Sequence, residues 1–237
     1  FATWLPNGFT TSWYSESWSS FQLGGVLVVT LEVAGAVLIG SALLGVPAAY
    51  ALARRDFPGK KLVMLLFVLP LIIPPFTYGI PLASVLYQFG LGGTLTGVIL
   101  ANLMPSVPFV IFILVPFIEQ IDPRVEAAAR VFGAGTWALF RSVMVPLLLP
   151  GILAALVLVL VRTIGLFELT FLTAGPGNQT LVVALYYSVF AAGMRANQTI
   201  DAMAVIYMVT SLVCLIIALR FVDPTQIVGR SKKSAAH

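Results

Sequence analysis

The sequence predicts an all-α fold, a helix bundle that crosses a lipid bilayer several times. Hydrophobic residues make up 59% of the 237 residues and charged residues only 9%, whereas soluble globular domains carry about 25% charged residues. Five stretches are apolar over the roughly 20 residues that a membrane span needs. Basic residues gather in alternate intervals between these stretches. We therefore expect residues 1–237 to form a single transmembrane domain.

The five expected spans cover residues 23–52, 62–87, 95–117, 145–172 and 200–222. The first is long enough to tilt or to extend beyond the membrane. Prolines interrupt the second span (Pro70, Pro74, Pro75) and the third (Pro105, Pro108, Pro116). Because proline removes a backbone donor, these positions predict either kinks for packing or broken helices that border a cavity.

The basic residues orient the bundle, since Lys and Arg concentrate in cytoplasmic loops. All but two of the 13 lie in residues 53–61, in residues 118–144, or at and after the end of the fifth span. Residues 1–21 are then an external segment and residues 223–237 a cytoplasmic tail. Aromatic residues of the external segment predict an interfacial belt or a docking surface for an external protein: Trp4, Trp13, Tyr14, Trp18 and Phe21.

Residues for catalysis or metal binding are scarce. The chain has one cysteine, Cys214, and one histidine, His237, so we expect no internal disulfide and no metal site. No phosphate-binding glycine loop ends in Lys-Ser or Lys-Thr, and FPGKKL at residues 57–62 is too short for one. We expect no catalytic site, no ATPase site, no cofactor and no nucleic-acid partner. A membrane enzyme would need a cluster of acids, His or Cys at membrane depth.

Three ionisable residues fall inside predicted spans: Glu32, Arg162 and Glu168. Such residues are expensive in a bilayer and are functional candidates by default. Glu32 and Arg162 each lie about 15 Å from the external end of a span, so an ion pair between them is geometrically reasonable. Glu168 comes six positions after Arg162 and points elsewhere. Either the pair is structural and Glu168 is interfacial, or Glu32 or Glu168 borders a solute path and meets a cation.

The longest polar interval, residues 119–144, predicts two short helices at the membrane surface. Pro123 can start the first, which is Ala-rich over residues 126–132, and Gly133 and Gly135 break it. Thr136 can cap a second helix over residues 137–144. A compact helix–turn–helix of this kind offers a rigid grip to a partner protein.

This interval resembles the coupling loop, or EAA loop, of permease subunits from binding-protein-dependent ABC importers. In that family the loop docks into a groove on the ATPase subunit and transmits its motion. The resemblance runs through EAAARVFGAGTWALFRSVMVPLLLPG, with matches at Ala128, Ala129, Gly133, Ala134, Phe140, Pro146 and Pro150. It implies that the ATPase-coupling residues here are Glu126, Ala128, Ala129, Arg130, Gly133, Ala134 and Phe140.

One position departs from the family pattern. The motif glutamate belongs at position 127, which is Ala127 here, and the acid Glu126 comes one residue early. One residue turns a helical side chain by about 100°. The shift predicts that Glu126 does not make the family's usual contact. Either Arg130 serves in its place, or this permease half docks more weakly than its partner half.

Other segments extend the resemblance over most of the chain. AAYALARRDFPGKK (48–61) resembles the family's first cytoplasmic turn, and GFTTSWY (8–14) resembles the external segment after the first span of spermidine/putrescine-type permeases. The latter implies a sixth span upstream. FLTAGPGNQTL (171–181) and DAMAVIYM (201–208) also resemble the polyamine branch, whereas residues 80–100 resemble the carbohydrate branch equally.

The resemblance implies a type I importer permease in the inner or cell membrane of a bacterium or archaeon. Its implied partners are a pair of ATPase subunits that bind ATP and Mg, a second and different permease, an external binding protein and membrane lipid. A polyamine is the first expected solute and a sugar or polyol the second, with iron, opine and phosphonate open. A channel or ATP-independent transporter is more remote, because it would leave residues 119–144 without a role.

Overall fold

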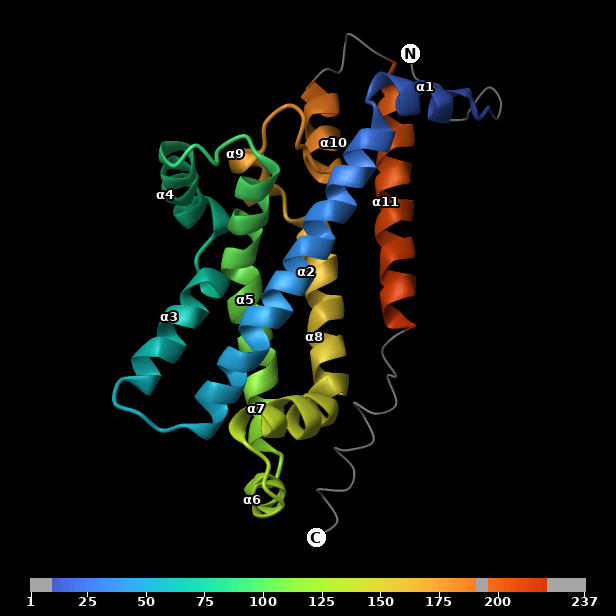
Figure 1. The fold of residues 1–237 in the computed structure, drawn as a ribbon. Coiled ribbons are helices and arrows are strands. Elements are labelled where there is room, and N and C mark those ends of the chain that lie inside the picture. Colours follow the sequence, from blue (N-terminus) through green and yellow to red (C-terminus); the bar gives the residue numbers. More distant parts are fainter. Residues whose placement is uncertain (1–9, 191–195, 221–237) are drawn as a thin grey trace.

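The computed structural model describes residues 10–190 and 196–220, and the regular structure in those residues is helical (Figure 1). In chain order the helices are α1 (Ser12–Ser20), α2 (Leu23–Arg54), α3 (Lys60–Ile72), α4 (Pro75–Gln88), α5 (Leu95–Glu119), α6 (Pro123–Val131), α7 (Thr136–Leu139), the π-helical turn η1 (Phe140–Met144), α8 (Val145–Gly165), α9 (Phe167–Thr173), α10 (Leu181–Phe190) and α11 (Asn197–Leu219). The predicted cytoplasmic tail and part of the external segment lie outside the described residues.

The membrane bundle predicted from composition is confirmed. Four helical stretches are long and apolar enough to cross a bilayer, namely α2, α5, α11 and the run from Thr136 to Gly165. The bent pair α3–α4 makes a fifth if it counts as one span. The first, third and fifth spans lie close to their predicted positions, with ends shifted by a few residues.

The second span was predicted as one helix, which is wrong. It is broken between α3 and α4, whose axes meet at 102°. Ile73 and Pro74 are both extended at this break, with ψ of 134° and 135°. The consecutive prolines Pro74 and Pro75 explain it, because a residue before proline is disfavoured in helical conformation. In α5, by contrast, the three prolines leave the helix continuous.

The fourth span also differs from the prediction of one helix over residues 145–172. It begins earlier, at Thr136, and ends at Gly165. Leu166 leaves the helical region, with ψ of 96°, before the short helix α9 begins. The following interval, expected as an external loop, contains α10, which the sequence reasoning did not predict.

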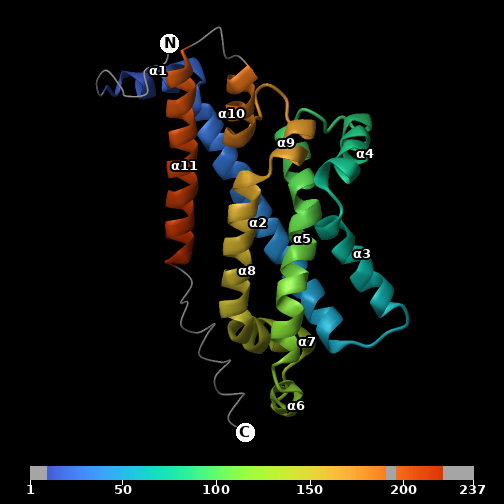
Figure 2. The same cartoon turned by 180° about the vertical axis from the view of Figure 1, so that it is seen from behind.

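The centre of the bundle is the crossing of α2 with α5, against which α8 packs (Figures 1 and 2). A Cβ added at Gly45 would lie 2.8 Å from Val110 Cγ1, and one at Gly40 would lie 2.9 Å from Leu103 Cδ2. Small residues thus let the two helices approach closely, as is common between membrane helices. The buried core around this crossing includes Val37, Ala49, Leu114, Ile118 and Leu148.

The bundle has two distinct ends (Figures 1 and 2). The α2–α3 connection, α6 and α7 lie at one end, here called the α6 end. The helices α1, α4, α9 and α10 lie at the opposite end, here called the α10 end. The basic intervals 53–61 and 118–144 therefore share one end, as the charge pattern predicts.

Candidate functional site

The α6–α7 segment projects from the α6 end of the bundle (Figure 1). Helix α6 begins at Pro123, a position where the backbone N–H that proline lacks has no partner within the helix. Asp122 Oδ1 accepts a hydrogen bond from Arg124 N at 2.9 Å and so caps the helix. It ends at Val131, and the chain turns away at Gly133, whose φ of +84° favours glycine. There the Gly133 and Ala134 amides donate to carbonyl oxygens of α6 at 2.9 and 3.1 Å. Local sequence therefore sets both ends of α6.

The second half of the segment differs from the predicted separate helix. Gly135 occupies the cap position of α7 and no side chain caps it, so the prediction that Thr136 caps this helix is wrong. From Thr136 the backbone runs through α7 and η1 directly into α8 as one helical stretch of 30 residues. Helix α6 is separate from the spans, whereas α7 lies across the α6 end and continues through η1 into α8 (Figure 1).

Glu126 faces into the protein. Only 8% of this residue is exposed. Its Oε1 atom accepts a hydrogen bond from Arg54 Nε at 2.5 Å, and its Oε2 atom accepts one from the Tyr50 hydroxyl at 2.7 Å. Arg54 Nη2 also donates to the Ile121 carbonyl oxygen at 2.7 Å. These three bonds hold the start of α6 against the last turns of α2.

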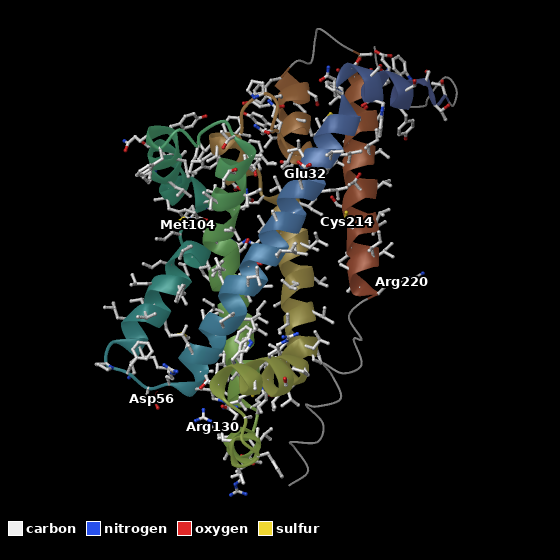
Figure 3. The ribbon with its side chains drawn as sticks, viewed as in Figure 1. Glu32, Asp56, Met104, Arg130, Cys214 and Arg220 are labelled. Carbon is white, nitrogen blue, oxygen red and sulfur yellow. The ribbon has the colours of Figure 1, made fainter. Side chains whose placement is uncertain are left out.

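The predicted coupling residues divide between two faces. With Glu126, the residues Ala129, Ala134 and Phe140 pack against the bundle, and the Phe140 ring meets the edge of Tyr50 at a centroid distance of 5.5 Å. Ala128, Arg130 and Gly133 are exposed. Figure 3 shows Arg130 at the α6 end. The inward group anchors the segment, and the outward group is free for contact.

Three large exposed residues were missed by the sequence reasoning. Val131, Phe132 and Trp137, here called the apolar tip, are 85%, 90% and 71% exposed. They lie at the α6 end of the bundle, Val131 and Phe132 at the end of α6 and Trp137 in α7. Large apolar groups that stay exposed together often mark contact sites for other proteins. The sequence feature that could have revealed them is a set of large apolar residues on both sides of Gly133 and Gly135, within an otherwise polar interval.

The ion pair predicted between Glu32 and Arg162 is not formed. The Arg162 guanidinium instead lies over the ring of Phe109 on α5, 5.4 Å from its centroid. Glu32 is exposed on α2 (Figure 3). Depth along the two spans predicted the pair, but the Arg162 side chain points to α5 and not to Glu32. Glu168 is half-buried in the first turn of α9, beyond the break at Leu166, and has no ion-pair partner among the described residues.

Two cavities border α2. One, of about 760 Å³, lies at the α10 end between the start of α2, residues 176–179 and α10. None of the described residues that line it is charged. The other, of about 420 Å³, is lined by apolar residues of α2, α8 and α11. In the part of the chain that the structure describes, no three His, Cys, Asp or Glu side chains gather as a metal site would need.

Residues 41–228 match the family described as binding-protein-dependent transport system inner membrane component. The chain belongs to this family. Its members are the permease subunits of ABC importers, so the resemblance seen in the coupling loop is confirmed. The match covers α3 to α11 and the last 14 of the 32 residues of α2, including both anchoring residues of that helix, Tyr50 and Arg54.

Relatives of this permease differ in the solutes that their names state. The molybdenum transport system permease ModB of Haemophilus influenzae is 32% identical over 80% of this chain and 89% of its own length. The diacetylchitobiose uptake permease NgcG of Streptomyces coelicolor is 35% identical over 63% of this chain, which spans half of NgcG. The sulfate permease CysT of Escherichia coli is 32% identical over 69% of this chain and 64% of its own length.

Solved structures show the same fold. A bacterial alginate ABC transporter in complex with a periplasmic protein superposes with a TM-score of 0.69, at 19% identity, over 90% of this chain and 82% of that one. A chain of an amino acid ABC transporter superposes with a TM-score of 0.61, also at 19% identity, over 90% of this chain and 98% of that one. The type I importer permease fold predicted for this chain is thus confirmed.

Proposed function

We propose that this chain is one permease half of an ATP-driven importer, and that its α6–α7 segment docks on the ATPase subunit. The observation that carries the proposal is the apolar tip, three large side chains exposed at the end of the bundle that holds the basic intervals. By the positive-inside rule this end is cytoplasmic, where an ATPase would meet it. The opposite end would then receive the solute from an external binding protein.

The anchoring contacts explain how docking could move the bundle. Glu126 and Arg54 join α6 to α2, and the backbone joins α7 to α8 without a break. A displacement of the docked segment therefore reaches two spans that pack against each other and against α5. ATP and Mg would be bound by the ATPase pair. This chain would contribute no chemistry, and a second, different permease would complete the path.

The solute remains a proposal with two candidates. A polyamine comes first, because the segments at residues 8–14 and 171–181 resemble that branch and two acidic residues lie at membrane depth. A sugar or polyol comes second, and the relative named for diacetylchitobiose supports it. The molybdenum and sulfate relatives show that the family also serves anions.

A substitution in the apolar tip tests the docking proposal. We expect Phe132→Asp to reduce the ATPase that co-purifies with the complex by at least tenfold, because a buried aromatic anchor contributes about 2 kcal/mol or more to an interface. Phe89→Asp is the matched control, since Phe89 is 77% exposed at the α10 end. Equal recovery of ATPase with both variants would refute the docking site. Uptake that continues without ATP would favour a channel or a secondary transporter.

A further inference from the structure

Glu32 is a carboxylate without a partner at membrane depth. It is exposed on α2, and neither of the ion pairs among the described residues includes it. Nor does it take part in any hydrogen bond within residues 10–190 and 196–220. A charged group inside a bilayer is retained where it meets a counter-charge or an aqueous path. The residues that the structure describes supply no counter-charge, so the group is available to a ligand.

The larger cavity lies directly above Glu32 on the same helix. Val28 and Val29 line this cavity, and Glu32 follows them by four and three residues. Residues at these spacings are neighbours on one face of a helix. Side chains of a helix also lean toward its N-terminus, which here is the α10 end. The Glu32 side chain therefore leans toward the cavity from the next turn of α2, although Glu32 is not itself among the residues that line it.

The walls of the cavity suit a hydrogen-bonding cation. Gln22, Gln179 and Ser188 bring polar groups, and Tyr187 brings an aromatic ring that packs 5.8 Å from the rings of Phe171 and Tyr186. Aromatic faces attract ammonium groups. None of the described residues that line the cavity is basic. An oxyanion would find no positive partner here, and a neutral sugar would leave Glu32 unpaired.

We infer that this cavity is the entry site for a small organic cation, with Glu32 as the counter-charge for its leading ammonium group. The inference rests on the proposed function for the direction of transport and specifies the solute class. Diamines and related short, flexible cations fit, because a cavity of about 760 Å³ is large enough for such a molecule together with water. The ammonium group of the solute would meet the Glu32 carboxylate one helical turn below the cavity, inside the span.

A single introduced cysteine tests the site. Gly25 lines the cavity, and a Cβ there would meet open space, so Gly25→Cys in a Cys214→Ala background places one thiol in the wall. Membranes containing the complex are treated from outside with impermeant cationic and anionic methanethiosulfonates. We expect the cationic reagent to gain about tenfold over the anionic one from the Glu32 charge. Glu32→Gln should abolish that preference.

Protection then identifies the ligand class. We expect putrescine to slow labelling of Gly25→Cys, Glu32→Gln to remove this protection, and trehalose and sulfate to have no effect. Gly35→Cys is the matched control, because Gly35 lies on the same helix with open space around it but lines the apolar cavity. It should resist both charged reagents.

Three results would overturn the inference: no labelling of Gly25→Cys from outside, protection by trehalose or sulfate that ignores Glu32, or no protection by any probe. The assay needs neither ATP nor an ATPase. The labelling result can therefore be interpreted even if the docking proposal is wrong. A negative labelling result would likewise leave the docking proposal unaffected.

Discussion

Arg54 Nε lies 2.5 Å from Glu126 Oε1, so the last residue of α2 is bonded directly to α6. The pair is mostly buried, with 13% and 11% of the two side chains exposed. Seventy-two residues of chain separate the two partners. The contact is therefore a tertiary clamp on the segment proposed to dock on the ATPase.

Breaking the clamp should loosen α6. Glu126→Ala removes the acceptor of Arg54 and Tyr50, and leaving buried donors unpaired costs about 1–3 kcal/mol. We expect faster proteolysis near Gly133 and a lower melting temperature of the purified complex. Glu119→Ala, at an exposed acid near the end of α5, is the control. If the reversed pair Arg54→Glu with Glu126→Arg recovers nothing over either single change, the pairing is not what anchors α6.

The turn after α6 should require glycine at only one of its two glycine positions. Gly133 has φ of +84° and Gly135 has φ of −68°, and an added Cβ meets open space at both. Gly133→Ala should cost about 1–2 kcal/mol of backbone strain and weaken coupling of ATP hydrolysis to uptake. Gly135→Ala should be nearly neutral. Equal coupling ratios for the two variants would contradict this explanation of the turn.

The α2–α5 crossing should tolerate no side chain at Gly45. A Cβ there would lie 2.8 Å from Val110 Cγ1, and overpacking typically costs about 1–3 kcal/mol. We expect Gly45→Val to lower the melting temperature and the yield of folded protein in detergent. Gly35→Val on the same helix is the control, because it faces open space. Matching melting curves would show that the helices separate more easily than their packing implies.

Glu32 and Arg162 should act independently on stability. They do not pair, and Arg162 lies over Phe109 instead. In a cycle of Glu32→Gln and Arg162→Gln, we expect the effects on the free energy of unfolding to add within about 0.5 kcal/mol. A coupling energy above about 1 kcal/mol would mean that the two charges meet after all.

Hydrophobic length predicted most of the bundle from the sequence, and the break in the second span has a local cause. Apolar runs placed α2, α5 and α11 within a few residues, because bilayer thickness sets their length. The presence of prolines alone did not show that the helix would break between α3 and α4 and stay continuous in α5. Side-by-side prolines at 74 and 75 leave an extended residue before them, whereas in α5 the prolines are spaced apart within a long helix.

The coupling segment shows the same limit at the level of single residues. Local chemistry predicted the start of α6 at Pro123 and the break at Gly133. It did not predict the clamp, since Arg54 and Tyr50 come from a distant span. Depth alone suggested the pair of Glu32 with Arg162, because depth says nothing about the direction in which each side chain points around its helix.

Helix α2 carries both Arg54 and Glu32, about 33 Å apart along its axis. A residue inserted between them would rotate one end against the other by about 100°. Glu32 would then turn away from the cavity, or Arg54 would leave Glu126. Single-residue insertions or deletions between Glu32 and Arg54 should therefore impair the protein, because they change the relative orientation of the two side chains, even when the inserted residue is apolar. Insertions and deletions should be tolerated better in the connection between α2 and α3, because it is not helical and does not fix the relative orientation of these two side chains.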